Sequence, residues 1–439
     1  MKSIILSVGD ELALGQTVDT NSAWISQQLA AVGCDIAAHL TVPDDQHAIE
    51  QAIQESVGRC DFLIISGGIG PTEDDLTRQA LAACMNVPLE LNEAWLHRLE
   101  AFFRKVGRPM PESNKIQAHI PRGAAIIENT AGTAAGIDAT FVTGDQKTVC
   151  RVFVMPGVPK EMKAMFTRDV LPHVAQATGG AVILSRTLHT FGMGESWVAE
   201  KLGSLMMRQK NPSVGTTVSH GIVSVRINAR HASRDDAQRA LDETTRACAL
   251  ALDDLIFGRD DETLPNELAA SLAPSRQTVA TAESCTGGLL AKMLTDIPGS
   301  SDYFHQGWVT YSNRAKQERL GVSENILKVH GAVSEPVVDA MARAARRLAK
   351  SDFALAISGV AGPTGGTEAK PVGTVCIALA FAKPAASAAG PDRKQFHADS
   401  DVRARTFTFP GDREMIRDRA AKMALAMLRF HLLGKEMPF

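Results

Sequence analysis

Residues 278–288 read Thr278-Val-Ala-Thr-Ala-Glu-Ser-Cys-Thr-Gly-Gly288. A run of β-branched and small apolar residues ends at Glu283. Two candidate nucleophiles follow, Ser284 and Cys285, and then two glycines that lead into an apolar segment. The pattern predicts a strand that turns sharply into a helix, with Ser284 or Cys285 at the corner. Backbone N–H groups at such a corner can stabilise an oxyanion or a bound anion.

The same alternation of short apolar runs and helical patterns occurs in the first third of the chain. Strands are predicted at Ser3–Val8, Phe62–Ser66 and Arg151–Met155, and an amphipathic helix is predicted at Asn21–Val32. Such alternation is typical of α/β proteins, in which helices cover both faces of a largely parallel sheet. Ligands of these folds bind beyond the carboxyl ends of the strands.

Length and pattern divide the 439 residues into three predicted domains. The first covers 1–170. The second, 171–257, is predicted to be a small α+β module, and the third covers 264–439 after a polar linker that ends in proline. The module's predicted elements are strands at Val182–His189 and Ile222–Ala229 and a helix at Arg234–Leu255; in the third domain, a loop is predicted at Ala382–Lys394 and a closing helix at Asp412–Leu433.

Composition excludes several classes of protein. The formal net charge of −3 gives no basic stripe, so nucleic acid is not an expected partner. The seven cysteines form no Cys-x-x-Cys motif, and an odd count argues against a secreted disulfide framework. No run reaches the ~18 apolar residues that a membrane span requires, and Met1–Val8 is too short for a signal peptide. We therefore expect a cytoplasmic protein.

A candidate base lies downstream in Tyr311-Ser-Asn-Arg-Ala-Lys316. No histidine stands in an evident motif, which leaves Lys316 to activate a serine. A free lysine has a pKa of about 10.4, so burial and nearby charge would have to lower the pKa by ~3 units for efficient base catalysis. Tyr311 could orient the lysine or relay its proton. Cys285 remains the rival nucleophile, although buried cysteines usually serve packing.

Further motifs suggest a phosphorylated substrate. A second glycine-rich loop, Ser358-Gly-Val-Ala-Gly-Pro-Thr-Gly-Gly366, includes Gly365 and Gly366, which would let the backbone approach a ligand closely. No Gly-Lys-Ser/Thr follows, which disfavours a nucleoside triphosphatase. Arg413 and Arg417 fall in the first turns of the last predicted helix, where cations are tolerated more readily beside a bound anion. These features point to acyl transfer on a small phosphorylated molecule.

A second constellation lies near the N-terminus, in Gly67-Gly-Ile-Gly-Pro-Thr-Glu-Asp-Asp-Leu-Thr77. Gly67 and Gly68 would end a strand, and the acids would begin a helix, where they complement its dipole. The same arrangement suits a phosphate bound through a hard cation such as Mg²⁺. Structural and functional interpretations both stay open at this point. Additional oxygen ligands could come from Gly9-Asp-Glu11 and from Asp19-Thr-Asn21.

The C-terminal motifs together resemble the C-terminal domain of the CinA family, whose members include nicotinamide mononucleotide deamidases. The resemblance covers about 264–435. It implies that Ser284 is the nucleophile, Lys316 the base and Tyr311 a supporting residue, with no metal or cofactor. Ser301 would contact substrate, and the N–H groups of Thr286, Gly287 and Gly288 would form the oxyanion hole. The resemblance to this family rests on the motifs Ala282-Glu-Ser-Cys-Thr-Gly-Gly288, Gly299-Ser-Ser301, Tyr311-Ser-Asn-Arg-Ala-Lys316, His330-Gly-Ala-Val-Ser-Glu-Pro336, Ser358–Gly366 and Lys370-Pro-Val-Gly-Thr374.

The N-terminal segments resemble the three-layer molybdopterin-binding-like domain that begins CinA proteins. In this family that domain is associated with metal-dependent hydrolysis of ADP-ribose to AMP and ribose 5-phosphate. The resemblance implies a divalent cation, Mg²⁺ or similar, with Asp74 and Asp75 as its ligands. Ala135 stands where the family more often has proline. The matching motifs also include Asn129-Thr-Ala-Gly-Thr-Ala134, Met155-Pro-Gly-Val-Pro-Lys-Glu-Met162 and, in the middle module, Gly192-Met-Gly-Glu-Ser196.

The sequence thus predicts a bifunctional hydrolase of pyridine nucleotide salvage, with nicotinamide mononucleotide and ADP-ribose as its substrates. One alternative is a molybdopterin-binding adenylyltransferase. Another is a competence or DNA-damage accessory protein that acts by binding partners and not by catalysis. The family resemblance also implies a homodimer.

Overall fold

The computed structural model describes residues 1–142, 149–382 and 400–439. Contacts divide the chain into two units, 1–185 with 228–243 and 186–227 with 244–439. The loop predicted at Ala382–Lys394 lies outside the described residues from 383 onward. Among the described residues, no helix is long and apolar enough to cross a membrane.

The first unit is built on a six-stranded sheet of order β2-β1-β3-β8-β7-β6. The neighbours β2, β1, β3 and β8 run parallel, whereas β7 and β6 continue the sheet antiparallel. The three predicted strands of this region are therefore confirmed as its central strands. The bounds are β1 Lys2–Val8, β2 Asp35–Val42, β3 Phe62–Ser66, β6 Ala125–Ile127, β7 Gly136–Val142 and β8 Val149–Met155, beside a small hairpin of β4 Leu89–Leu91 and β5 His119–Pro121.

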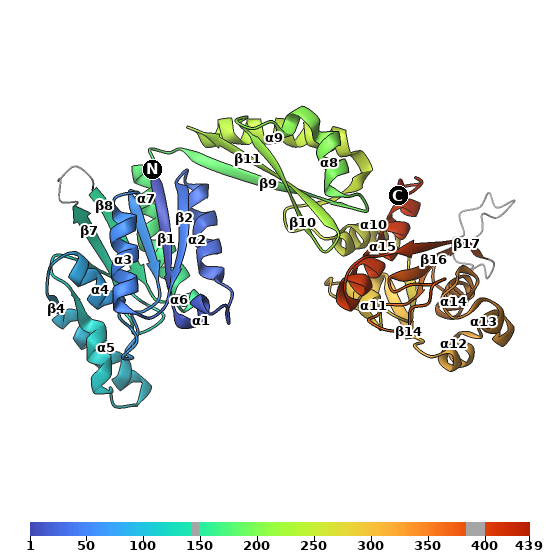
Figure 1. Cartoon of the computed structure of the whole chain (residues 1–439), viewed down its shortest axis with the longest axis horizontal. Helices are drawn as coiled ribbons and strands as arrows, with labels where there is room; N and C mark the ends of the chain where they lie inside the picture. Colours follow the sequence, from blue (N-terminus) through green and yellow to red (C-terminus); the bar gives the residue numbers. More distant parts are fainter. Residues whose placement is uncertain (143–148, 383–399) are drawn as a thin grey trace. The chain divides into compact units, whose positions relative to one another are not determined.

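Helices cover both faces of this sheet (Figure 1). One face buries Ile4, Leu6 and Leu63 against α3 and α4, and the other buries Ile5 and Ile64 against α2, α6 and α7. Because successive strand residues point to opposite faces, a fully apolar strand is stable only when both faces are covered. The bounds are α1 Asp10–Ala13, α2 Thr20–Ala31, α3 Gln46–Val57, α4 Thr77–Cys84, α5 Glu93–Val106, α6 Pro159–Met165 and α7 Leu171–Ala177, with η1 Glu112–Ala118 and η2 Phe166–Val170.

The middle of the chain forms a four-stranded sheet of order β10-β11-β9-β12. Strand β11 alternates buried and exposed residues from Val223 to Arg230, as expected of a sheet with one covered face. The sequence predicted β9, β11 and the long helix α9 but missed β10 and α8. The bounds are β9 Val182–Phe191, α8 Glu195–Leu202, η3 Gly203–Met206, β10 Ser213–Ser219, β11 Ile222–His231, α9 Arg234–Leu252, η4 Asp253–Leu255 and β12 Ile256–Arg259.

The C-terminal part carries a five-stranded sheet of order β14-β13-β15-β16-β17. Strands β14, β13 and β15 are parallel, and β16 and β17 are antiparallel additions at one edge. The carboxyl ends of the three parallel strands therefore meet at one edge of the sheet, and the motifs that follow them are brought together there. The bounds are β13 Val279–Glu283, β14 Phe304–Val309, β15 Phe353–Gly359, β16 Thr374–Ala382 and β17 Ser400–Thr408.

Two layers of helices enclose this sheet. Alanines of β13, β15 and β16 face α14, whereas larger residues on the other face, such as Leu355 and Ile377, pack against α15. The α/β class predicted from the alternating pattern is thus confirmed in both units. The bounds are α10 Leu264–Ser275, α11 Leu289–Thr295, η5 Ser300–Asp302, α12 Asn313–Leu320, α13 Glu324–His330, α14 Glu335–Ala349 and α15 Arg413–Leu432.

Candidate active site

Ser284 lies at the corner between β13 and α11, as the sequence predicts. Strand β13 is buried along its whole length and ends at Glu283. The backbone turns through Gly287 and Gly288, whose φ angles are 61° and 95°, in the region that favours glycine. The Ser284 N–H donates to the carbonyl of Ile357 on β15, at 2.9 Å, which holds the corner against the neighbouring strand.

The Glu283 carboxylate fixes the start of α11. This side chain is fully buried and accepts hydrogen bonds from the N–H groups of Gly288, Leu290 and Ala291 at 2.8–3.0 Å. A carboxylate at a helix N-terminus satisfies donors that have no partner within the helix and complements the dipole. This role of Glu283 was not predicted from the sequence. The signal was an acid placed at the end of an otherwise apolar strand, directly before a glycine turn.

Lys316 contacts Ser284 directly. Its Nζ donates to Ser284 Oγ and to the carbonyl of Thr310, each at 2.9 Å. The lysine is 1 % exposed, on helix α12, which Ser312 caps through the N–H of Ala315. Burial lowers the pKa of Lys316 from 10.5 to about 8, since a charged amine is poorly solvated there. The amine is thus far closer to neutrality at pH 7 than a free lysine.

Cys285 follows Ser284 directly in the chain, but the protonation of its thiol makes it a poor nucleophile. Burial raises the pKa of the Cys285 thiol to about 12. The thiolate, which is the nucleophilic form of cysteine, is therefore scarce at neutral pH. The environment of this corner favours the serine over the cysteine as the nucleophile.

The N–H groups that are available to an oxyanion are not the Thr286, Gly287 and Gly288 set expected from the sequence. The Gly287 N–H donates to the Ser284 carbonyl and the Gly288 N–H to Glu283, so both already have partners. Among the described residues, the Thr286 N–H has no hydrogen-bond partner, and the Cys285 N–H contacts the thiol of its own side chain but no other residue. They are the donors of this turn that remain open to a ligand.

A cavity of about 280 Å³ opens in front of Ser284. Tyr311, Gly365 and Arg413 line it together with Ser284 and Lys316. Arg413, in the first turn of α15, donates to Tyr311 Oη at 2.9 Å and to the carbonyl of Gly362 at 2.8 Å. These two hydrogen bonds hold the guanidinium at the cavity wall, where its remaining N–H groups can meet an anion.

Three other residues from the motifs lie elsewhere. Ser301 is exposed in η5 and does not line the cavity. Gly366 also lies outside the lining, and a Cβ there would come within 2.8 Å of the Val372 nitrogen, so this glycine serves close packing. Arg417 donates to the Thr286 carbonyl at 2.7 Å and so supports the turn that carries Ser284.

In the N-terminal unit, Gly67 and Gly68 follow β3 as predicted, but close packing accounts for both. A Cβ at Gly67 would lie 2.2 Å from the Val8 carbonyl oxygen, and one at Gly68 would lie 2.1 Å from Thr77 Oγ1. Their φ angles of 109° and 65° also favour glycine. Packing against β1 and α4 therefore explains these two glycines without a bound phosphate.

The acids and amides at this edge are largely engaged within the protein. The Asp75 carboxylate accepts from the N–H groups of Gly70 and Thr72 and from the Thr72 hydroxyl, at 2.5–2.9 Å. Asp19 caps α2. Burial alone would raise its pKa, but hydrogen bonds from Ser22 and Ser7 outweigh burial and hold the pKa of Asp19 below its ordinary value.

Asn21 and Asp74 complete this edge. The Asn21 amide donates to the Gly157 carbonyl at 2.8 Å, which ties α2 to the end of β8. Asp74 is exposed, and it lies near Asp44, a residue that the sequence analysis missed. Burial raises the pKa of Asp44; a hydrogen bond from the Asp10 N–H lowers this pKa, but the charges of Asp10 and Asp74 raise it, and the net shift is upward. Its signal was the position two residues after the end of β2, at the same edge as Asp10.

These residues do not fit a preformed metal site. No group of three or more His, Cys, Asp or Glu side chains in the described ranges is placed to hold a metal ion. Asp75 would have to give up hydrogen bonds with its own loop to become a ligand. A divalent cation in this unit therefore stays a prediction.

Three sequence families match successive parts of the chain. The CinA C-terminal domain matches residues 261–432, which include the Ser284 site. A probable molybdopterin binding domain matches 4–176, and the damage-inducible protein CinA KH domain matches 185–258.

Relatives align with nearly the whole chain. A CinA-like protein of Anaeromyxobacter sp. is 41 % identical over 430 residues, 98 % of each chain, and a CinA-like protein of Geobacter sulfurreducens is 39 % identical over 434 residues, 99 % of this chain and all of the relative. The crystal structure of the competence/damage inducible protein CihA from Agrobacterium tumefaciens shares 36 % identity, covers 39 % of this chain and 93 % of its own, and gives a TM-score of 0.34.

Fold and site thus define a multidomain α/β protein with a buried serine–lysine pair at the end of a parallel strand. The matches extend over all three parts of the sequence in order. The chain belongs to the CinA family.

Proposed function

We propose that the C-terminal domain is an amidohydrolase that converts nicotinamide mononucleotide to nicotinic acid mononucleotide and ammonia. The observation that carries this proposal is the buried contact of Lys316 Nζ with Ser284 Oγ at 2.9 Å. Burial has moved the lysine pKa to about 8, so a substantial neutral fraction exists near physiological pH. A neutral amine at hydrogen-bond distance is the base that a serine nucleophile needs.

In the first half-reaction, Ser284 Oγ attacks the carboxamide carbon while Lys316 Nζ accepts the serine proton. The carbonyl electrons move onto oxygen, and the Cys285 and Thr286 N–H groups are the open donors that can stabilise this oxyanion. When the carbonyl re-forms, the C–N bond breaks and the leaving nitrogen takes the proton from Lys316. The products are ammonia and an ester of Ser284.

In the second half-reaction, water attacks the ester carbon and Lys316 accepts the water proton. The C–Oγ bond then breaks, Ser284 recovers its proton from Lys316, and the free acid leaves. The cationic pyridinium ring of the substrate withdraws electrons from the carboxamide and so favours attack. Lys316 is neutral again after each half-reaction, and a proton from water replaces on Ser284 the one that left with ammonia, so every proton transfer passes through a residue of the chain itself.

Arg413 suits the phosphate of such a substrate. Among the described residues that line the cavity, Lys316 and Arg413 are the two with cationic side chains. Its two hydrogen bonds inside the protein fix the guanidinium at the wall, and arginine can bind phosphate through two parallel N–H groups. In the proposed complex the carboxamide meets Ser284 and the phosphate meets Arg413.

The test is ammonia release from nicotinamide mononucleotide by the full chain, without added metal. Wild type should release ammonia, and Ser284→Ala and Lys316→Ala should each reduce the rate at least about a thousandfold. Lys292→Ala is the matched control, because Lys292 is an exposed lysine of α11 that pairs with Asp296. A folded wild-type protein that releases no ammonia would overturn the proposal, and so would full activity in Ser284→Ala.

For the N-terminal unit, hydrolysis of ADP-ribose with a divalent cation stays a prediction based on family resemblance. The contacts of Asp75 with its own loop give it no direct support. A chemical assay can separate the possibilities, since AMP plus ribose 5-phosphate would support the hydrolase and an adenylylated pterin would support the alternative transferase.

A further inference from the structure

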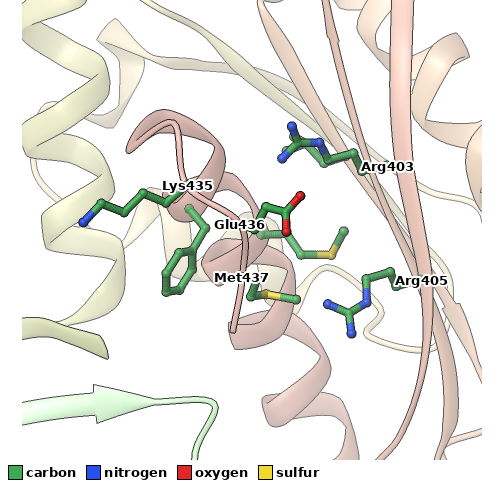
Figure 2. A pocket seen from close by; sticks show the side chains of 8 residues that line it. Arg403, Arg405, Lys435, Glu436 and Met437 are labelled. Carbon is green, nitrogen blue, oxygen red and sulfur yellow. The ribbon is translucent and has the colours of Figure 1, made fainter. Parts of the chain in front are cut away.

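A second cavity lies in the C-terminal part of the chain, lined by none of the residues around Ser284 (Figure 2). Its volume is about 260 Å³. The walls come from β17, from the last turns of α15 and from the segment that follows α15. The features that matter are two arginines, an apolar floor and one acid.

The arginines are Arg403 and Arg405 on β17, the edge strand of the sheet. Because they are two residues apart on one strand, both point to the same face. Each guanidinium lies over an aromatic ring, Arg403 over Phe381 and Arg405 over Phe407. Within the described residues neither forms an ion pair, although Arg405 donates to the Phe439 carbonyl at 2.7 Å.

The floor of the cavity is apolar. Leu379 of β16 and Met427 and Phe430 of α15 are buried beneath it, and Met437 closes one side. Aromatic and thioether groups of this kind contact a flat ring favourably. The cavity therefore offers cations at one wall and an apolar surface for a ring at the other.

Two further charged residues line the cavity, Lys435 and Glu436. Lys435 is paired with Asp254, so its charge is already compensated. Glu436 lines the cavity and forms no ion pair with the described residues, and Figure 2 shows its carboxylate extending toward β17. A bound anion would be attracted by the two arginines and opposed by Glu436.

We propose that this cavity binds a mononucleotide, with its phosphate on Arg403 and Arg405 and its base on the apolar floor. The volume is near the lower end of ligand pockets, about 300 Å³, which favours one base and one phosphate over a dinucleotide. Arginines recognise phosphate through paired N–H groups. The site is separate from the proposed deamidase cavity, and the proposal does not rest on deamidase activity.

The experiment is a calorimetric titration of the full chain with AMP, with adenosine and inorganic phosphate as separate arms. AMP should bind, and each arm alone should bind at least about tenfold more weakly, because phosphate and base contribute together. Arg403→Gln and Arg405→Gln should each weaken AMP about tenfold or more. Glu436→Gln should tighten AMP several-fold, which a merely structural role of Glu436 would not produce.

Two controls keep the proposal open to refutation. Arg319→Gln should leave this AMP affinity unchanged, since Arg319 is exposed on α12 and lines neither cavity. Arg403→Lys and Arg405→Lys keep the positive charge but lose the paired N–H groups of arginine. Each should bind AMP more weakly while its melting profile stays the same as that of wild type, so the weaker binding comes from lost phosphate recognition. The proposal is overturned if AMP does not bind at millimolar concentration, if the double glutamine variant binds AMP as wild type does, or if phosphate alone binds as tightly as AMP.

Discussion

Lys316 Nζ lies 2.9 Å from Ser284 Oγ, although 32 residues separate them along the chain. The contact depends on two adjacent parallel strands, because Ser284 follows β13 and Lys316 lies on the helix that follows β14. The same helix buries the amine and lowers its pKa to about 8. Strand order, burial and pKa together support the proposed roles of Ser284 as nucleophile and Lys316 as its base.

The proposed deamidase should become faster as pH rises through about 8. Burial lowers the Lys316 pKa from 10.5 to about 8, and only the neutral amine can accept the serine proton. The neutral form predominates above this pKa, so kcat/KM should fall about tenfold for each pH unit below it and level off above it. The pH profile of the control variant Lys292→Ala should have the same midpoint as that of wild type. A rate that is constant from pH 6.5 to 9.5 would contradict the role of Lys316.

Cys285→Ser should retain ammonia release within about threefold of wild type. The pKa of the buried thiol is raised to about 12, so only roughly one molecule in 10⁵ carries a thiolate at pH 7. Ser284→Ala serves as the inactive reference in the same assay. Should Cys285→Ser lose as much activity as Ser284→Ala, the cysteine would be the nucleophile instead.

Arg413→Gln should impair use of the phosphorylated substrate specifically. A hydrogen bond to a charged group contributes about 1.5–3 kcal/mol, which corresponds to a roughly 10- to 150-fold loss in kcat/KM for nicotinamide mononucleotide. The matched substrate is nicotinamide riboside, which lacks the phosphate and should react with both enzymes at similar rates. Equal losses for the two substrates would show that Arg413 acts instead through Tyr311 or the Gly362 loop.

Gly67→Ala should destabilise the N-terminal unit by more than about 3 kcal/mol, since the new Cβ combines unfavourable φ with backbone overlap. The added atom would lie 2.2 Å from the Val8 carbonyl oxygen. Gly15→Ala is the matched control. Gly15 also has a positive φ, of 70°, but has nothing within 4 Å of its Cβ position, and should cost only about 1–2 kcal/mol. Calorimetric unfolding distinguishes the two, and equal costs would contradict the packing role of Gly67.

Asp75→Asn should destabilise the same unit by about 1–3 kcal/mol, and Mg²⁺ should not change this difference. The carboxylate accepts three hydrogen bonds from Gly70 and Thr72, which one amide oxygen cannot replace. Asp74→Asn, at an exposed position, should have little effect. The measurement is the melting temperature with and without Mg²⁺. If Mg²⁺ stabilises wild type but not Asp75→Asn, Asp75 is a metal ligand after all.

The sequence correctly predicted much of the local secondary structure. The strand–turn–helix at Ser284, the central strands and the helix that begins near Arg413 all follow from periodicity and from glycine positions. Residues within a few positions of each other determine such features. The alternating pattern also indicated the α/β class, because a strand that is apolar on both faces requires helices on both sides of the sheet.

Other features could not be predicted because they depend on segments far apart in the chain. The hydrogen bond of Arg413 with Tyr311 joins positions 102 residues apart, and it requires α15 to begin at the carboxyl edge of the sheet. Ser301 shares a motif with the active region but lies outside the cavity, because η5 is placed away from that edge. The glycines at 67 and 68 indicated a ligand cradle in sequence, yet contacts with Val8 and Thr77 explain them.

Local sequence patterns indicate which residues could react and which turn would present them. The folded chain is needed to show that Ser284 has an amine within reach, that the pKa of this amine is lowered and that Cys285 stays protonated. The physical reason is that strand and turn formation depend on neighbouring residues in the chain. A pKa depends on how much water the whole fold removes from a group and on which charges it leaves nearby.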